Sequence, residues 1–393
     1  MRAFEFLTES KKVNEALAMR DYAHPEEYLV RDGVDAAVEI LEEFKEDLEQ
    51  PESLNVKWDG KAAVFWGRDE SGEFYMVPNN QWNKGQKLSR NDLEGEIKRT
   101  GKKLPAQSDE EFAAVRQEIA DNYSRQWQIL EKSSPKQGFY WGDIMFDSPP
   151  SKDSQGDYEF TPNKITYTAD SEKEIGQAIE KGAEIFIAVH GLVPEFGTDP
   201  TSDLKPVAQN ELAALNSRNP RAYLLSERPE KKPASVSTDF IDQGIKTLSS
   251  LKGDVDSFLN YTAPKFTGFK GILRDYINNR VKARGKLDFT DFLKSSKLSQ
   301  NQQNIAMEFV SNNQKAMQSF IKAVDIVIDT KNRVLGEIHK HHGSSMKDRL
   351  GISASVGGKE GGEGYAKIRK SGSGIKYVNP EFRSAPVNPR FGG

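Results

Sequence analysis

The chain has 393 residues, and 55 Lys and Arg stand against 59 Asp and Glu, for a net charge of −4. With 36% hydrophobic and 29% charged residues, the composition is that of a globular protein and excludes a fibrous or wholly disordered chain. The absence of cysteine excludes disulfides, thiolate metal sites and cysteine nucleophiles. The charge balance argues against a uniformly basic nucleic-acid-binding surface and leaves a local basic groove open.

The first half of the chain is predicted to be α+β. Residues 10–49 carry apolar residues at helical spacing, and His24-Pro25-Glu26-Glu27 is typical of a helix start. After Pro51 the pattern becomes strand-like. Strands are predicted over 54–66, 73–77, 138–146, 158–168 and 184–192, and helices over 109–132 and 171–181.

Residues 205–350 are predicted to be almost entirely helical, with a Pro/Lys/Ser linker over 227–237. Strand texture returns at 363–379, after a glycine-rich loop over 351–362. We therefore expect a helical segment at 1–50, a sheet core at 51–204, a helical insertion at 205–350, and completion of the core by 351–393. No segment approaches the ~20 apolar residues that span a bilayer, and the glutamate at position 5 is unlike a secretory signal.

Four short motifs carry the candidate chemistry. Lys57-Trp58-Asp59-Gly60 separates two strand-like runs, and by itself its Asp-Gly pair is typical of a hairpin turn. Asp143 interrupts the aromatic strand 138–146, where an acid on an apolar face is costly unless it is paired or binds a ligand. Glu363-Gly364 opens one late strand, and Lys376 lies between β-forming residues of another.

In this order the motifs resemble those of the covalent nucleotidyltransferases: RNA ligases, DNA ligases and capping enzymes. The resemblance covers about residues 51–200 and 355–380. It implies an α+β fold, with an antiparallel-sheet nucleotidyltransferase core (ATP-grasp-like ligase) that here carries a large all-α insertion. It also implies ATP and Mg²⁺ as cofactors and a lysine that attacks the α-phosphate, holding AMP as a phosphoramidate.

The resemblance assigns roles residue by residue. Lys57 is the expected nucleophile, and Lys376 is expected at the α-phosphate, where it acts in the transition state. Glu363 is expected at the metal, and Asp143 at the metal or the ribose. The remaining nucleotide-binding candidates are Asp59 and Gly60 in the loop, Tyr140 or Trp58 as an adenine-stacking ring, and Lys84 as either a phosphate contact or an ordinary turn lysine.

A second resemblance, to proteins of T-even-like tailed phages, spans most of the chain. It is carried by His24-Pro25-Glu26, Lys57 to Gly60, Phe65 to Asp69, Gly142-Asp143, Phe160 to Tyr167, Val189-His190 and Glu363-Gly364-Tyr365. Phe6-Leu7-Thr8-Glu9 resembles the targeting peptides of proteins packed into such phage heads, which implies cleavage after Glu9 by the prohead protease. The first turn of an amphipathic helix is the alternative. The expected location is thus the virion or the host cytoplasm, with capsid and protease as partners.

Departures from the ligase pattern leave alternatives open. Ala62 stands where many DNA ligases carry arginine, and Lys376 stands where many relatives have two lysines. The short segment after Lys376 also leaves no room for the oligonucleotide-binding barrel of DNA ligases and capping enzymes. The main expectation is therefore an RNA-ligase-like enzyme passing AMP to a nucleic-acid 5′-phosphate. The alternatives are AMP transfer to a host protein, and a phage head protein that binds nucleotide or is structural, without turnover.

The stretch 265–286 is the candidate nucleic-acid contact. It interleaves seven basic residues with Phe266, Phe269 and Tyr276, a pattern that suits phosphates and stacked bases. An ordinary solvated helix face explains the same pattern equally well.

Overall fold

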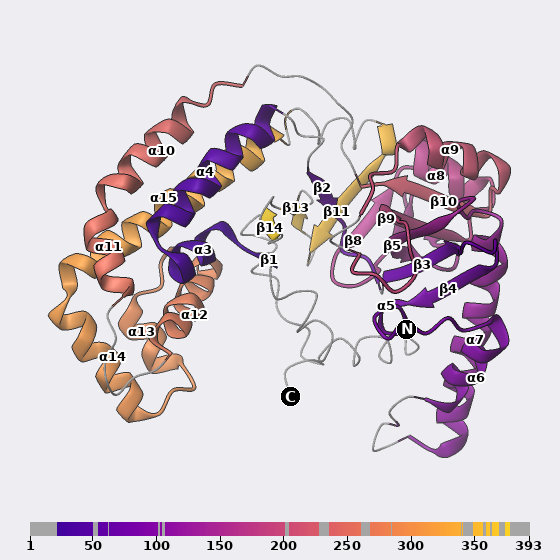
Figure 1. Ribbon diagram of the computed structural model, residues 1–393, viewed down its shortest axis with the longest axis horizontal. Coiled ribbons are helices and arrows are strands. Elements are labelled where there is room, and N and C mark those ends of the chain that lie inside the picture. The colour runs from indigo at the N-terminus through magenta and orange to yellow at the C-terminus, as the bar shows by residue number, and fades with distance from the viewer. Residues whose placement is uncertain are drawn as a thin grey trace.

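The computed structural model places a helical part and a β-rich part on either side of a small four-stranded sheet (Figure 1). The structure describes residues 22–49, 54–61, 63–100, 103, 107–200, 204–227, 236–260, 268–283, 285–338, 340, 349–356, 359–361, 364–368 and 374–377. Over these residues the chain is a mixed α+β protein whose sheets are largely antiparallel. Residues 1–21, with the expected cleavage site at Glu9, lie outside this range.

The helical part combines two segments that are far apart in the sequence. It contains α3 (Pro25–Asp32), α4 (Val34–Glu49), α10 (Asp239–Ser250), α11 (Lys252–Leu259), α12 (Phe269–Lys282), α13 (Phe289–Ser295), α14 (Gln300–Asn312) and α15 (Gln314–Ile338). The apolar stripe of α4 packs against α10 and α15. The N-terminal helices are therefore part of the helical domain, rather than the separate segment expected for 1–50.

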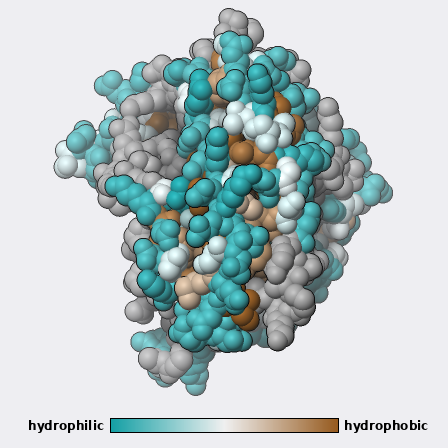
Figure 2. Space-filling model, turned by 90° about the vertical axis from the view of Figure 1, so that its left-hand side faces the viewer, coloured by the Kyte–Doolittle hydropathy of each residue, from teal (hydrophilic) through white to brown (hydrophobic). Residues whose placement is uncertain are grey.

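A buried ion pair fixes this arrangement. Lys331 Nζ in α15 lies 3.1 Å from both carboxylate oxygens of Glu26 in α3, and both side chains are fully buried. The outward face of these helices is mostly hydrophilic, with small separate hydrophobic patches (Figure 2). In the described residues, no helix combines the length and the apolar character needed to cross a bilayer.

The central sheet has the strand order β10 (Ala222–Ser226), β9 (Ile185–Val193), β5 (Gly138–Phe146), β3 (Ala63–Arg68) and β4 (Phe74–Pro78). Among the described strands of this sheet, only β9 and β10 pair in parallel. The short helix α5 (Asn79–Trp82) follows β4. One face is covered by α6 (Arg90–Arg99), α7 (Asp109–Glu131) and α9 (Gln209–Arg218), through residues such as Ile97, Trp127 and Leu212.

The pairing of β10 corrects the expected start of the helical insertion. Residues 205–226 were predicted to belong to the helical insertion, yet Ala222–Ser226 pairs with Ile185–Val189 and extends the central sheet. A short apolar run in a sequence is compatible with either a buried strand or a helix. Here the segment is a strand because it pairs with the edge of β9. The helical insertion therefore begins at α10.

The outer sheet has the order β12 (Lys359–Gly361), β11 (Ile352–Val356), β8 (Thr166–Ala169), β7 (Tyr158–Phe160) and β6 (Ser151–Lys152), all antiparallel, with α8 (Glu174–Glu180) after β8. The glycine-rich segment 351–362 was expected to be a loop. That expectation is wrong at both ends of the segment, because β11 pairs with β8, with Ala354 opposite Tyr167, and with β12 over Lys359–Gly361.

The four-stranded sheet joins the two parts. Its order is β1 (Tyr22–Ala23), β14 (Gly374–Tyr377), β13 (Gly364–Ile368) and β2 (Asn55–Lys57). The strand β13, which comes late in the sequence, pairs antiparallel with the early strand β2. Segments from both halves of the sequence therefore form this one sheet. On one face of this sheet, Lys367 and Tyr377 contact Asp47 of α4, and Phe44 packs on the Tyr377 ring.

Candidate functional site

Residues 57–60, the lysine loop, cross from one sheet to another. Lys57 ends β2 in the four-stranded sheet, and β3 begins in the central sheet three residues after Gly60. The two strands do not pair with each other, so the hairpin interpretation of Asp59-Gly60 is wrong. The loop instead lies where the two sheets meet.

Asp59 holds this loop in place. Its carboxylate accepts hydrogen bonds from Asn163 Nδ2 at 3.1 Å, Lys164 N at 2.7 Å and Ile165 N at 3.0 Å. Its own backbone N–H donates to the Tyr167 hydroxyl at 2.8 Å. Asp59 therefore holds the lysine loop against the segment that leads into β8. Both oxygens of its carboxylate accept hydrogen bonds in this contact.

The two aromatic candidates for stacking on adenine belong to the core. Trp58 is 3% exposed and packs against the rings of Tyr167 and Phe186, at centroid distances of 5.7 and 6.0 Å. Tyr140 is 1% exposed, contacts the Trp66 ring and donates its hydroxyl to Glu211. Because both rings are enclosed by side chains, the expectation that either stacks on a base is wrong for this conformation.

Lys57 and Lys376 point from the same face of the four-stranded sheet. Lys57 is opposite Gly364 on β13, and Lys376 is opposite Ala366, two residues farther along the same strand. Directly opposed residues share a face, and so do residues two apart on a strand. The strands β2 and β14 flank β13 and are therefore about 10 Å apart. This face is the one turned away from α4, which contacts the opposite side.

The lysine loop lies against a cluster of Asp143, His190 and Glu227, which come from β5, β9 and the end of β10. His190 Nδ1 is 2.6 Å from Glu227 Oε2, and His190 Nε2 is 3.5 Å from Asp143 Oδ1. The exposed fractions of the side chains fall from 24% for Asp143 to 15% for His190 and 4% for Glu227. The cluster thus extends from a solvent-accessible carboxylate to a buried one.

A β-bulge positions His190 in this cluster. Trp141 of β5 is opposite Gly191, and Gly142 is opposite Val189, so His190 is the extra residue of β9. Bulges redirect a side chain and often lie beside active sites. Gly142 permits the close approach of the strands, since a Cβ there would lie 2.5 Å from the Ala188 carbonyl oxygen.

Charge and burial oppose each other at this cluster. Burial lowers the pKa of His190, but the carboxylates of Glu227 and Asp143 outweigh it and raise the pKa to about 10. Burial raises the pKa of Glu227 by more than the charges of His190 and Lys57 lower it. The imidazole therefore holds its proton at neutral pH, and the Lys57 ammonium is close enough to influence Glu227.

Two further contacts join the lysine loop to the cluster. A Cβ at Gly60 would lie 2.5 Å from Asp143 Cβ, so the loop backbone rests directly on Asp143. The Val56 N–H, one residue before Lys57, donates to the Glu227 carbonyl at 2.7 Å. Lys57, Asp143, His190 and Glu227 are therefore one site, built where the central and four-stranded sheets meet.

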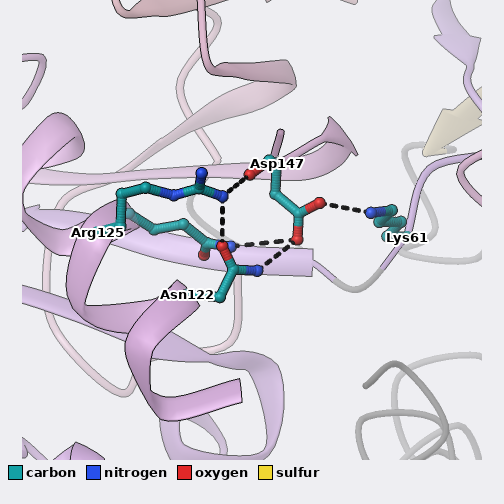
Figure 3. A network of polar contacts seen from close by, with 5 residues as sticks. Lys61, Asn122, Arg125 and Asp147 are labelled. Atoms are coloured by element: carbon teal, nitrogen blue, oxygen red, sulfur yellow. Dashed lines mark hydrogen bonds and ion pairs between the residues drawn. The ribbon is translucent and has the colours of Figure 1, made fainter. Parts of the chain in front are cut away.

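The neighbouring Lys61 has a structural role, because its ammonium forms an ion pair with Asp147 (Figure 3). Its Nζ lies 2.6 Å from Asp147 Oδ1, and Asn122 Nδ2 donates to the other oxygen at 2.8 Å. Arg125 donates to the Asp147 carbonyl and, at 2.7 Å, to Asn122 Oδ1. Within the described residues the Lys57 side chain makes no hydrogen bond or ion pair, so it is not held by a carboxylate as Lys61 is.

The other predicted site residues lie elsewhere or outside the described chain. Lys84 is exposed in the turn after α5, where Gly85 packs on Gly197. Glu363 lies outside the described residues, so its expected role at a metal stays a prediction.

The basic stretch 265–286 is not a stacking surface in the part that is described. Phe269 and Tyr276 are 9% and 1% exposed and pack in the helical core. Arg280 pairs with Asp325 at 3.1 Å, and Lys270 donates to the Arg31 carbonyl at 3.0 Å. Lys265 and Phe266 lie outside the described residues. The expectation that the aromatic rings of this stretch stack on nucleic-acid bases is therefore wrong for Phe269 and Tyr276.

His190 and Glu227 were not predicted as site residues. Glu227 was assigned to the linker, and His190 was named only in the Val189-His190 motif of the second resemblance. The available signal was a histidine within one apolar strand and a glutamate directly after another, but only the parallel pairing of β9 and β10 brings the two together.

No curated protein and no solved structure matches this chain. A family model described as "Family of unknown function (DUF6267)" matches residues 22–386, which include every residue of the site. The chain therefore belongs to the DUF6267 family.

Proposed function

We propose that the protein is an ATP-dependent nucleotidyltransferase, RNA-ligase-like, in which Lys57 is the nucleophile. The observation that carries this proposal is the shared face of Lys57 and Lys376, with the lysine loop resting on Asp143. A covalent nucleotidyl transfer needs a lysine free of ion pairs and a second cation for the phosphate. Lys57 meets the first need, and Lys376 stands on the same face.

The proposed first step is attack of the Lys57 amine, after loss of its proton, on the α-phosphorus of ATP. A P–N bond forms, the bond to the bridging oxygen breaks, and pyrophosphate leaves. Lys376 would stabilise the charge that develops on the α-phosphate. In the second step an acceptor 5′-phosphate oxygen displaces the lysine, so that AMP is transferred and the amine is restored.

A divalent metal is implied by this chemistry, and Asp143 suits it. Its side chain is 24% exposed and directly under the lysine loop, so a carboxylate oxygen is accessible beside the proposed phosphate position. Oxygen ligands are those that Mg²⁺ prefers, and it usually retains several waters. The metal, when bound, neutralises phosphate charge, whereas Lys57, Asp59 and Lys376 orient the reacting groups.

The decisive experiment is incubation of the full chain with ATP labelled at the α-phosphate and with Mg²⁺ or, in parallel, Mn²⁺, followed by denaturing electrophoresis. We expect the wild-type protein to retain an acid-labile label. Lys57→Ala and Lys57→Arg should both lose it, the second although it keeps the positive charge. Lys98→Ala, on the exposed side of α6, is the matched control and should label as the wild type does.

The absence of label in wild-type protein shown by mass spectrometry to carry no AMP would contradict the proposal. If such protein still binds ATP in equilibrium dialysis, the alternative of a nucleotide-binding phage head protein without turnover takes its place. Label that appears equally in Lys57→Ala would place the nucleophile elsewhere. With labelling established, 5′-phosphorylated RNA, 5′-phosphorylated DNA and host-cell protein should be compared as acceptors, because the first step is common to all three.

A further inference from the structure

The cluster of Asp143, His190 and Glu227 has the layout of a metal site in which one ligand is oriented by a second carboxylate. Glu227 Oε2 approaches Nδ1 of His190 at 2.6 Å, on the side of the ring away from Asp143. Nε2 faces Asp143 Oδ1 at 3.5 Å. A carboxylate at one ring nitrogen fixes the imidazole tautomer and orientation, and it leaves the other nitrogen for a metal.

The distance between the two facing atoms fits one shared ion. Nitrogen and oxygen ligands that are each about 2.1 Å from the same ion lie about 3 to 3.5 Å from one another. The observed separation of 3.5 Å is at the end of that range. It is longer than the usual ~2.7 to 3.2 Å of an N–H···O hydrogen bond, so in the metal-free protein the two side chains form a long ion pair.

Burial supports the same division of roles. Glu227 is buried, as an orienting carboxylate should be, whereas His190 and Asp143 keep 15% and 24% of their side chains exposed. A site with two protein ligands and a solvent-accessible side leaves coordination positions for water or substrate oxygens, which is typical of a catalytic metal rather than a structural one. A dication that binds at Nε2 takes the place of the proton that this nitrogen carries in the metal-free protein, and the two carboxylates then balance the charge of the ion.

We infer that His190 Nε2 and Asp143 bind one divalent transition-metal ion, of the Mn²⁺ class, with Glu227 as the positioning residue. The imidazole nitrogen is the reason for this class, because Mg²⁺ prefers oxygen ligands whereas imidazole suits later first-row ions. The inference deepens the proposed function by naming its metal, but it rests on the geometry of three side chains, and its test does not require adenylylation.

The test is direct measurement of Mn²⁺ binding to the full chain, stripped with a chelator and dialysed, from the electron paramagnetic resonance signal of free Mn²⁺. We expect one ion per chain in the wild type, and binding at least tenfold weaker in Asp143→Asn and His190→Ala. Glu227→Gln should weaken binding by about 10- to 100-fold, as expected for an orienting partner. Mg²⁺ should displace the ion only at concentrations at least tenfold higher.

Two controls keep the outcomes separate. The chain has five histidines, and three of them are His339, His341 and His342, so the variant with both His341→Ala and His342→Ala tests for binding at that cluster instead. It should retain the ion. Lys57→Ala should also retain the ion although it loses the label, which separates this inference from the proposed function.

The inference is overturned if the wild type binds no Mn²⁺, or if folded Asp143→Asn and His190→Ala bind it as the wild type does. Asp143→Asn keeps nearly the same shape, so it remains informative if His190→Ala does not fold. Loss of the ion only in the His341/His342 double variant would overturn the inference as well.

Discussion

The backbone of Glu227 accepts a hydrogen bond from Val56, which immediately precedes Lys57, while its side chain approaches His190 at 2.6 Å. One residue thus links the strand of the proposed nucleophile to the cluster beside it. Because the Val56 contact uses the main chain, a side-chain substitution at Glu227 changes the electrostatics of His190 and leaves this link intact.

The first prediction concerns the protonation of His190. Its pKa of about 10 in the folded protein exceeds the ordinary value of 6.5. A raised pKa means that the proton stabilises the native state fully below pH 6.5, and that this stabilisation is lost as the pH rises toward 10. In metal-free buffer, the free energy of unfolding of the wild type minus that of His190→Gln should therefore decrease between pH 6.5 and 10.

The same prediction is tested more directly by histidine NMR. In Glu227→Gln the pKa of His190 should fall by about 1 to 3 pH units, because an opposite charge in contact with the imidazolium is removed. A titration midpoint that does not change in this variant would show that the ion pair with Glu227 is not the cause of the raised pKa.

The second prediction separates the roles of the two lysines. Lys376→Ala should lower the single-turnover rate of label formation by about 10²- to 10³-fold, because it removes a cation that acts mainly in the transition state. ATP binding, measured by equilibrium dialysis, should change only a few-fold. A variant that labels at the wild-type rate would exclude Lys376 from the reaction.

The third prediction concerns the contact between the lysine loop and Asp143. Gly60→Ala places a methyl group 2.5 Å from Asp143 Cβ, so it should displace the loop, destabilise the protein by about 1 to 3 kcal/mol and abolish labelling. Gly95→Ala in α6 is the control. Its methyl group meets open space, and it should stabilise the protein by about 0.5 to 1 kcal/mol with labelling unchanged. Equal effects of the two changes in urea unfolding would contradict the packing of the loop.

The fourth prediction concerns the buried pair of Glu26 and Lys331, both fully buried. Lys331→Met leaves a buried carboxylate without its cation, so it should cost about 3 to 5 kcal/mol in urea unfolding. The double variant Glu26→Gln with Lys331→Met should recover a large part of that loss, because no charge is then buried. A double variant as unstable as the single one would show that the packing around α3 and α15, not the charge, sets the cost.

The local elements could be predicted from the sequence. The aromatic strand around Asp143, the long helix over 109–132 and the helices of the second half all follow from the period of their apolar residues. The Lys57 motif was also recognisable, since its residue types are specific and contiguous in the chain. The same periodicity misassigned Ala222–Ser226, because a short buried strand carries no period of its own.

The tertiary structure alone decided that His190 and Glu227 belong to the site. His190 reaches the cluster through a bulge, and Glu227 reaches it because β10 pairs in parallel with β9. Neither feature is encoded locally, since a bulge depends on the register of two strands and a parallel pair on a connection of many residues. The sequence by itself therefore determined which lysine was the candidate nucleophile. The resemblance also named Lys376 and Asp143. Strand pairing between distant segments determined that His190 and Glu227 join Asp143 beside the lysine loop, and that Trp58 and Tyr140 are core.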